Sequence, residues 1–186
     1  SKVNLKGADL KGADLNGANL EEANLSGADL RHSWLNETNL SHANLSNADL
    51  DNATFSGVNL SGANLKKAYA SNGNLSEAIL DVANLSQTDL SGTNLTGADL
   101  RHAYLDSSIL IKTNLSNAIL SYAQMRKANL LGANLLDADL RMADLRGANL
   151  TDADLSTANL SHANMEGAIF CNTLTPWGED NSGCRK

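Results

Sequence analysis

Residues 8–30 read ADLKGADLNGANLEEANLSGADL, and this stretch decides the fold because one five-residue unit recurs in it without interruption. The unit continues in both directions: its central apolar residue stands at every fifth position from Leu5 to Phe170, which gives 34 repeats, 29 of them centred on leucine. The residue two places before the centre is small, most often Ala, and the residue directly before it is mostly Asn or Asp. Such a period indicates a repeat protein rather than an ordinary globular domain.

A period of five fits neither an α-helix nor a straight β-strand. In an α-helix each residue advances by about 100°, so the leucines would spread around the axis and form no apolar stripe. In a straight strand successive side chains alternate between faces, so leucines five residues apart would point to opposite sides. The chain must therefore bend once in every repeat, which keeps the leucine and the small residue inside and the other three residues outside.

The polar residues of the repeat support a bend at the same place each time. Asn and Asp before the leucine favour turns with their own backbone, and Gly, Ser and Asn are frequent at the two positions after it. The chain has a single proline, Pro176, which follows the repeats, and this is expected where every backbone N–H pairs with a neighbouring coil. Ala70 interrupts the leucine ladder and Gly73 follows it, so we expect the interior to be underfilled or distorted there.

Composition restricts the functions that the chain can have. The net charge is −7, so nonspecific binding to nucleic-acid phosphates or to anionic membranes is not expected. No apolar run approaches the roughly 18 residues of a membrane-spanning helix, so we expect no membrane insertion. The sequence contains neither a nucleophile with a suitably spaced His and acid nor a Gly-rich phosphate loop. We therefore expect no enzyme activity, no catalytic or metal-binding residues and no cofactor.

Units such as Ala8-Asp9-Leu10-Lys11-Gly12 and Ala98-Asp99-Leu100-Arg101-His102 resemble the pentapeptide-repeat family, and the resemblance covers residues 3–170. It implies the all-β fold of that family, a right-handed quadrilateral β-helix with four repeats in each coil. The repeats then make about 8 coils and a rod about 40 Å long at the usual spacing of paired strands.

The regular pattern ends at Phe170. Because an uncovered coil exposes unpaired backbone groups, we expect residues 1–170 to form the β-helix and residues 171–186 to form a C-terminal capping segment. Within this segment Leu174 and Trp177 are the apolar residues expected to cover the last coil.

The capping segment, CNTLTPWGEDNSGC from Cys171 to Cys184, is similar to the tail of cyanobacterial and plant chloroplast pentapeptide-repeat proteins, in which two cysteines close a loop. The resemblance implies a disulfide between Cys171 and Cys184 and an oxidising compartment such as the periplasm or the thylakoid lumen. Two reduced thiols in a cytoplasmic protein, or a metal site with only two protein ligands, are the alternatives.

With four repeats in each coil, residues 20 apart lie on the same face, and acidic residues then form a column along one face. The column consists of Asp9, Asp29, Asp49, Asp51 and Asp89. One interpretation, favoured by the Asn residues at equivalent positions, is that each carboxylate closes its own turn. The other is that the column imitates the phosphates of DNA or binds a cation.

Apolar residues at outward positions are concentrated in the second half of the repeats. Four of them form a candidate partner surface: Ile109, Ile111, Leu131 and Leu136. Ile111 and Leu131 should lie on adjacent coils, and an exposed apolar patch of this kind is typical of a partner or self-association site. Further outward apolar residues are Ile119, Tyr122 and Met142. Three histidines, at positions 42, 102 and 162, share one repeat position but lie too far apart to bind one metal ion.

Two hypotheses about function follow. The favoured one is a non-enzymatic structural or interaction module that presents flat β-helix faces to a protein partner; a homodimer through an exposed coil edge or through the apolar patch is compatible with it. The alternative comes from the resemblance, because some pentapeptide-repeat proteins imitate B-form DNA and bind DNA gyrase, inhibiting it or protecting it from quinolones. The moderate negative charge and the absence of loops within the repeats argue against the alternative. Neither hypothesis involves direct binding to nucleic acid.

Overall fold

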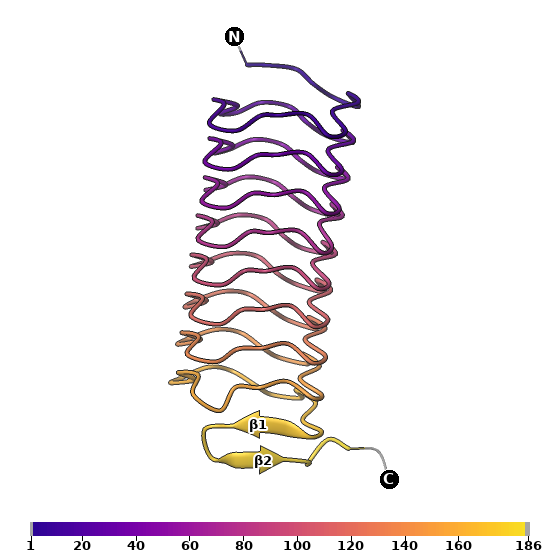
Figure 1. Ribbon diagram of the computed structural model, residues 1–186. Helices are drawn as coiled ribbons and strands as arrows, with labels where there is room; N and C mark the ends of the chain where they lie inside the picture. Colours follow the sequence, from indigo (N-terminus) through magenta and orange to yellow (C-terminus); the bar gives the residue numbers. More distant parts are fainter. Residues whose placement is uncertain (1, 185–186) are drawn as a thin grey trace.

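The computed structural model describes residues 2–184, and the chain winds in it into a rod of stacked coils (Figure 1). Each coil takes 20 residues, because parallel backbone bridges join residues 20 apart, from Asn4 and Asn24 to Asp154 and Leu174. A coil of this length contains four repeats, which gives the quadrilateral cross-section that the resemblance to the pentapeptide-repeat family implied. Residues 2–184 contain no helix. The predicted all-β coil is thereby confirmed.

All five backbone N–H groups of a repeat find acceptors, as the repeat around Leu25 illustrates. The N–H groups of Leu25 and Gly27 donate to carbonyls of the following coil, at 2.7 and 2.9 Å. The N–H of Asn24 donates to the preceding coil (2.9 Å), and that of Ala23 closes the preceding turn (3.0 Å). The remaining N–H, of Ser26, donates to Oδ1 of Asn24 at 3.1 Å. Asn and Asp precede the leucine because their side chains supply the one acceptor that the backbone does not.

The bend of a repeat is made by the second residue after its central residue, which adopts a positive φ in the described repeats except at Thr157. Gly27 has a φ of 67° and Asn47 a φ of 56°. This left-handed conformation costs glycine nothing and asparagine little, which explains why both residues are frequent at this position. The turn redirects the chain towards the next face of the rod.

Leucine and small residues fill the interior, and the central leucines of the repeats from Leu25 to Leu155 are at most 2% exposed. Several Ala positions carry Thr or Ser instead, and their hydroxyl groups donate to backbone carbonyls. Thr88 Oγ1 donates to the Leu65 carbonyl of the preceding coil at 2.7 Å. Because such a buried hydroxyl is satisfied, the substitution avoids the cost of an unpaired polar group.

The interruption at Ala70 produces a local distortion. The N–H of Gly73 is not hydrogen-bonded to the Ala70 carbonyl in the described structure, whereas the turns on either side keep this bond. A Cβ atom on Gly73 would lie 3.2 Å from the Ala53 carbonyl oxygen and 3.9 Å from the Phe55 ring. Phe55, one coil earlier, is larger than the usual leucine and 1% exposed. The small residues at positions 70 and 73 thus lie near Phe55, which is larger than the usual leucine.

The C-terminal segment forms an antiparallel hairpin of β1 (Thr173–Thr175) and β2 (Gly178–Asp180), visible at the lower end of the rod in Figure 1. The expectation that Leu174 and Trp177 cover the last coil is wrong, since their exposed fractions are 43% and 58%. Strand β1 continues the five-residue pattern, which places Thr173 and Thr175 inside and Leu174 at an outward position. Trp177 lies in the turn between the two strands.

Candidate functional site

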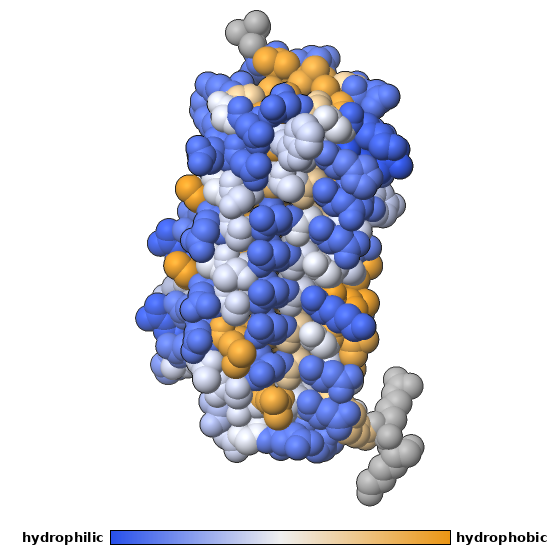
Figure 2. Space-filling model, in the orientation of Figure 1, coloured by the Kyte–Doolittle hydropathy of each residue, from blue (hydrophilic) through white to orange (hydrophobic). Residues whose placement is uncertain are grey.

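Outward side chains form straight columns along the rod, because residues 20 apart stack on successive coils. The residue before each leucine lies on a flat face, and the two residues after it lie at a corner. Figure 2 shows a largely hydrophilic outer surface with separate hydrophobic patches, and a concentration of hydrophobic side chains at the N-terminal end. A candidate site must therefore be described as a set of neighbouring columns.

The structure brings together three of the four residues of the predicted partner surface. The Lys112 N–H donates to the Leu131 carbonyl at 2.8 Å, so Ile111 and Leu131 lie at one corner on adjacent coils. Ile109 lies on the neighbouring face of the same repeat and is 38% exposed, while Ile111 and Leu131 are half-buried. Leu136 lies one corner further round the rod. The compact apolar patch therefore consists of Ile109, Ile111 and Leu131.

The acidic column exists, and its carboxylates are bonded to the protein's own backbone. Asp9, Asp29, Asp49 and Asp89 stack on one face, interrupted by Tyr69 between the last two. In each of the four, Oδ1 accepts the N–H of the second residue along, at 2.9 to 3.2 Å. Asp51 lies at the adjacent corner, where its Oδ1 accepts both the N–H and the hydroxyl of Ser71, at 2.8 and 2.7 Å. The four stacked carboxylates thus each accept from their own turn, whereas Asp51 accepts from the turn of the following coil.

A positive side chain also stands within the acidic column. The Arg31 guanidinium donates to both carboxylate oxygens of Asp29, at 2.9 and 2.5 Å, and approaches Asp49 at 3.5 Å. The hydrogen bonds from this side chain lower the pKa of Asp29 to about 2. Arg31 thus keeps Asp29 ionised and offsets its charge.

The spacing of charge differs from that of DNA. One residue of a column occurs in each coil, so the carboxylates are about 4.8 Å apart at closest. Double-stranded DNA carries one charge per roughly 1.7 Å of its axis. A rod of about 40 Å with a net charge of −7 therefore has a much lower charge density than duplex DNA of the same length.

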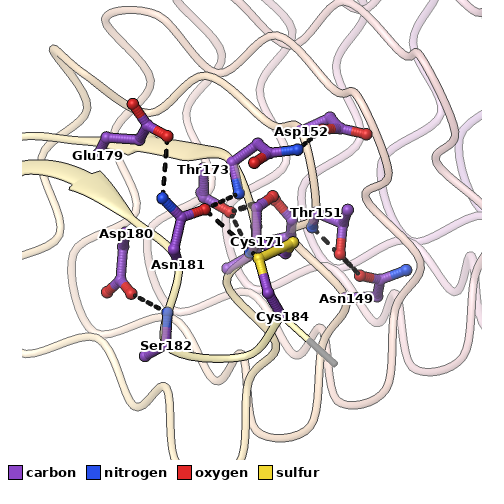
Figure 3. Close-up of a disulfide and its surroundings, with 12 residues drawn as sticks. Asn149, Thr151, Asp152, Cys171, Thr173, Glu179, Asp180, Asn181, Ser182 and Cys184 are labelled. Carbon is purple, nitrogen blue, oxygen red and sulfur yellow. Dashed lines mark hydrogen bonds between the residues drawn. A yellow bond between two sulfur atoms is a disulfide. The ribbon is translucent and has the colours of Figure 1, made fainter. Parts of the chain in front are cut away.

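Cys171 and Cys184 form a disulfide, with a distance of 4.7 Å between their Cα atoms (Figure 3). Around it, the Cys171 N–H donates to Thr173 Oγ1 at 3.0 Å, and the Gly183 N–H donates to the Phe170 carbonyl at 2.7 Å. A Cβ atom on Gly183 would lie 2.8 Å from the Phe170 nitrogen, so only glycine fits at this position. The bond fixes the end of the tail against the last repeat, and neither cysteine is a free thiol.

Residues 2–184 contain neither a metal-binding cluster nor a membrane-spanning helix. No group of three or more His, Cys, Asp or Glu side chains is arranged to hold a metal ion there. In the same part of the chain, no helix is long and apolar enough to cross a membrane.

Large outward side chains also meet at another corner of the rod and form a cluster there. We call it the Tyr122 corner, and its column consists of Val82, His102, Tyr122, Met142 and His162. The rings of His102 and Tyr122 are stacked, with centroids 5.1 Å apart. Next to them a depression of about 450 Å³ is lined by Ser121, Tyr122, Arg141, Met142, Ser161 and His162. The residues of the column are spaced by 20 in the sequence, the length of one coil, and this spacing predicts that they lie in one column.

Comparison with known proteins gives consistent matches. The family model described as pentapeptide repeats matches eight overlapping segments between residues 4 and 174. HetL, a pentapeptide repeat protein involved in heterocyst differentiation regulation in the cyanobacterium Nostoc sp. strain PCC 7120, is 30% identical; the match covers 95% of this chain and 91% of HetL, with a TM-score of 0.54. QnrB1, a plasmid-mediated fluoroquinolone resistance protein, is 19% identical over 88% of this chain and 90% of its own, with a TM-score of 0.58.

A pentapeptide repeat protein from the Arabidopsis thaliana thylakoid lumen is 26% identical over 74% of this chain and 71% of its own, with a TM-score of 0.39. No curated protein sequence matches the chain.

Proposed function

The chain belongs to the pentapeptide-repeat family and has its right-handed quadrilateral β-helix, and from this premise we propose that it is a non-enzymatic interaction module that binds a protein partner through its outer columns. The observation that carries the proposal is the patch of Ile109, Ile111 and Leu131. These three apolar side chains point outward on adjacent coils of a rod whose core is already filled by leucine. A solenoid offers extended surfaces of this kind for recognition.

The shape of the rod supports binding rather than chemistry. Its columns are straight and its backbone is hydrogen-bonded from coil to coil, so the patch is held without a cost for ordering on binding. The patch is bordered by Lys112 at the same corner and by Asn129 on the same face, which gives an apolar centre with a polar rim. Leu136, one corner away, belongs to the partner surface only if the partner wraps around that corner.

The proposal includes an oxidising compartment, such as the periplasm or the thylakoid lumen. Its support is the disulfide between Cys171 and Cys184, since disulfides persist in such compartments and are rare in the cytosol. Quantifying free thiols in protein isolated from its own cells under alkylating conditions tests this part. Two alkylated cysteines in the isolated protein would contradict it.

Site-specific photo-crosslinking tests the interaction surface. A photoreactive amino acid placed at position 109 should crosslink to one defined protein in an extract of the cells that make the chain, and the band should disappear in the Ile111→Ser/Leu131→Ser variant. The matched control places the same amino acid at position 129, on the next coil of the same face, in the otherwise unchanged protein. Crosslinks that persist in the double variant would overturn the role of the patch. A crosslinked species of twice the chain's mass would identify a second copy as the partner.

The acidic column supports one alternative function, in which the chain imitates DNA and binds DNA gyrase. We rank it second because Arg31 stands within the column and the carboxylates of Asp9, Asp29 and Asp49 are engaged by backbone N–H groups. A gyrase supercoiling assay, with and without a quinolone, separates the two functions. Inhibition or protection at low micromolar protein that is lost in the Asp9→Asn/Asp49→Asn variant would put the alternative first; no effect would remove it.

A further inference from the structure

The Tyr122 corner differs from the other three corners in the residues that it places at left-handed positions. Across the part of the chain that the structure describes, the second residue after the leucine is usually Gly, Asn, Asp or a charged residue. Val82, Tyr122 and Met142, the large apolar residues with a positive φ there, all fall in this one column, with φ values of 57°, 61° and 61°. His102 and His162 occupy the same column, and His42 lies at the same corner nearer the N-terminus.

These apolar residues do not contribute to the core in return for their strained conformation. A non-glycine residue in the left-handed region costs about 1 kcal/mol or more, and a β-branched residue is the least suited to it. The exposed fractions of Val82, Tyr122 and Met142 are 48%, 52% and 48%, so little apolar area is buried to compensate. Residues that cost stability and remain exposed in one column are typical of a binding surface.

The neighbouring columns give this corner an alternating pattern. Ile79 precedes Val82 and Ile119 precedes Tyr122, and both isoleucines are exposed, at 43% and 37%. The coil between them carries the ion pair of Asp99 with Arg101, and the coil after Ile119 carries that of Asp139 with Arg141. Apolar and ionic bands therefore alternate along the corner from coil to coil, about 4.8 Å apart.

The depression at the corner combines both kinds of band. Its apolar lining is Tyr122 and Met142, and the stacked ring of His102 holds Tyr122 in place. Methionine adapts its shape and makes favourable contacts with aromatic rings. An aromatic side chain of a partner would fit against these two residues.

The ionic part of the depression is a preoriented donor. Arg141 donates from Nε and Nη2 to the two oxygens of Asp139, at 2.8 and 2.7 Å, which fixes the plane of the guanidinium. An arginine has five N–H groups, so further donors remain, and the Arg141 side chain is 57% exposed. His162 also lines the depression. A carboxylate is the acceptor that such donors bind most strongly.

We propose that the Tyr122 corner is a second interaction surface, which binds a protein segment carrying an aromatic side chain next to a carboxylate. The aromatic ring lies against Tyr122 and Met142, and the carboxylate accepts from Arg141. The distance between an apolar band and the next ionic band suits the side chains of two adjacent residues in the bound segment. The corner lies diagonally across the rod from the patch of Ile111 and Leu131, so the two surfaces can be occupied independently.

Methionine-methyl NMR on the whole chain tests the proposal, with acetyl-Trp-Glu-amide as the probe. Met142 is the reporter, while Met125, which is fully buried, is the internal control. The probe should shift the Met142 methyl signal and leave that of Met125 unchanged. The neutral probe acetyl-Trp-Gln-amide should bind about tenfold more weakly, since it lacks the charge-assisted bond to Arg141. The net charge of −7 disfavours binding of an acidic probe in general. Tighter binding of the acidic probe would therefore come from the contact with Arg141.

Variants separate binding from folding. Tyr122→Gly removes the aromatic wall and also relieves the strained φ, so binding should be lost while the melting temperature stays the same or rises. Arg141→Gln should abolish the preference for the acidic probe. The matched control is Lys127→Gly, which changes a left-handed position at another corner, with a φ of 57°, and should leave binding intact.

Three results would overturn the proposal. The first is the absence of any Met142 shift at millimolar probe, and the second is equal affinity for the acidic and the neutral probe. The third is a Met142 shift that appears on raising the protein concentration alone, which would make a second copy of the chain the occupant. None of these results bears on the Ile111 and Leu131 crosslinks, so the proposed function and this inference fail separately.

Discussion

At the residue scale, the second residue after nearly every leucine adopts a left-handed conformation whose cost depends on the type of residue. Thr157 is the one described residue at this position that has no positive φ. Its turn is rearranged, and the N–H of Asp137 donates to Thr157 Oγ1 at 2.8 Å instead of to the carbonyl of residue 156. A β-branched side chain avoids the left-handed region, and here its hydroxyl replaces the lost backbone acceptor. Val82 has no hydroxyl and remains strained.

Replacing Val82 with glycine should therefore stabilise the protein. We expect Val82→Gly to raise the free energy of unfolding by about 1 kcal/mol, because relief of the strained φ outweighs the entropy that glycine loses on folding. Gly27→Val is the matched reverse change, since a Cβ there meets no atom within 4 Å and only the φ of 67° opposes it. It should destabilise the protein by a similar amount in urea unfolding. Equal stability of both variants and the wild type would contradict the cost assigned to this position.

The pairing of Arg31 with Asp29 predicts a dependence on pH. The pKa of Asp29 is about 2, below that of the unfolded chain, so the pair stabilises the fold above pH ~4 and this contribution is lost as the pH falls towards 2. Arg31→Gln should raise the pKa of Asp29 towards its usual value, as measured by carboxyl ¹³C NMR titration. Arg101→Gln, which removes the partner of Asp99, should leave the Asp29 titration unchanged. A titration of Asp29 that does not move in Arg31→Gln would show that backbone bonds alone lower its pKa.

At the scale of the repeat, neighbouring coils supply hydrogen bonds that a repeat lacks. Where Trp34 stands in place of Asn or Asp, the N–H of Asn36 donates to Asn16 Oδ1 of the preceding coil, at 2.9 Å. Where Gln124 stands before Met125, Asp106 Oδ1 of the preceding coil accepts the N–H of Arg126, at 2.9 Å. An aromatic residue before the leucine is therefore tolerated when the adjacent coil carries Asn or Asp after its own leucine.

We expect the disulfide to stabilise the segment that contains the hairpin of β1 and β2. The Cys171→Ser/Cys184→Ser variant should lose roughly 3 kcal/mol of local stability, as expected for a loop of 13 residues, and hydrogen exchange should accelerate in residues 173–184. Exchange in the coils before residue 130 should not change, because each coil contacts only its neighbours. Gly183→Ala is a second variant that should loosen the same segment, since its Cβ would meet Phe170. Uniform acceleration along the whole rod would contradict this picture.

At the scale of the molecule, stacking of equivalent coils makes the rod modular. Deleting residues 24–43 removes one coil of 20 residues and rejoins Ala23 to Asn44, so every column stays in register. We expect this variant to fold and to be shorter by about 4.8 Å in small-angle scattering. Deleting residues 24–26 alone should instead unfold the adjacent coils, because it turns leucines outward. Failure of the 20-residue deletion to fold, with the three-residue deletion tolerated, would refute the modular description.

The sequence by itself determined the bend in each repeat, the inward leucine and alanine, and the outward polar positions, because a period of five residues excludes a helix and a straight strand. Resemblance added four repeats in each coil and the pairing of Cys171 with Cys184. Tertiary structure decided what depends on contacts between coils: the offset of the acidic column by Arg31, the outward place of Leu174, and the meeting of His102, Tyr122 and Met142 at one corner. His102, Tyr122 and Met142 follow one another at intervals of 20 residues, and only the stacking of the coils, with the direction of each side chain, brings them together.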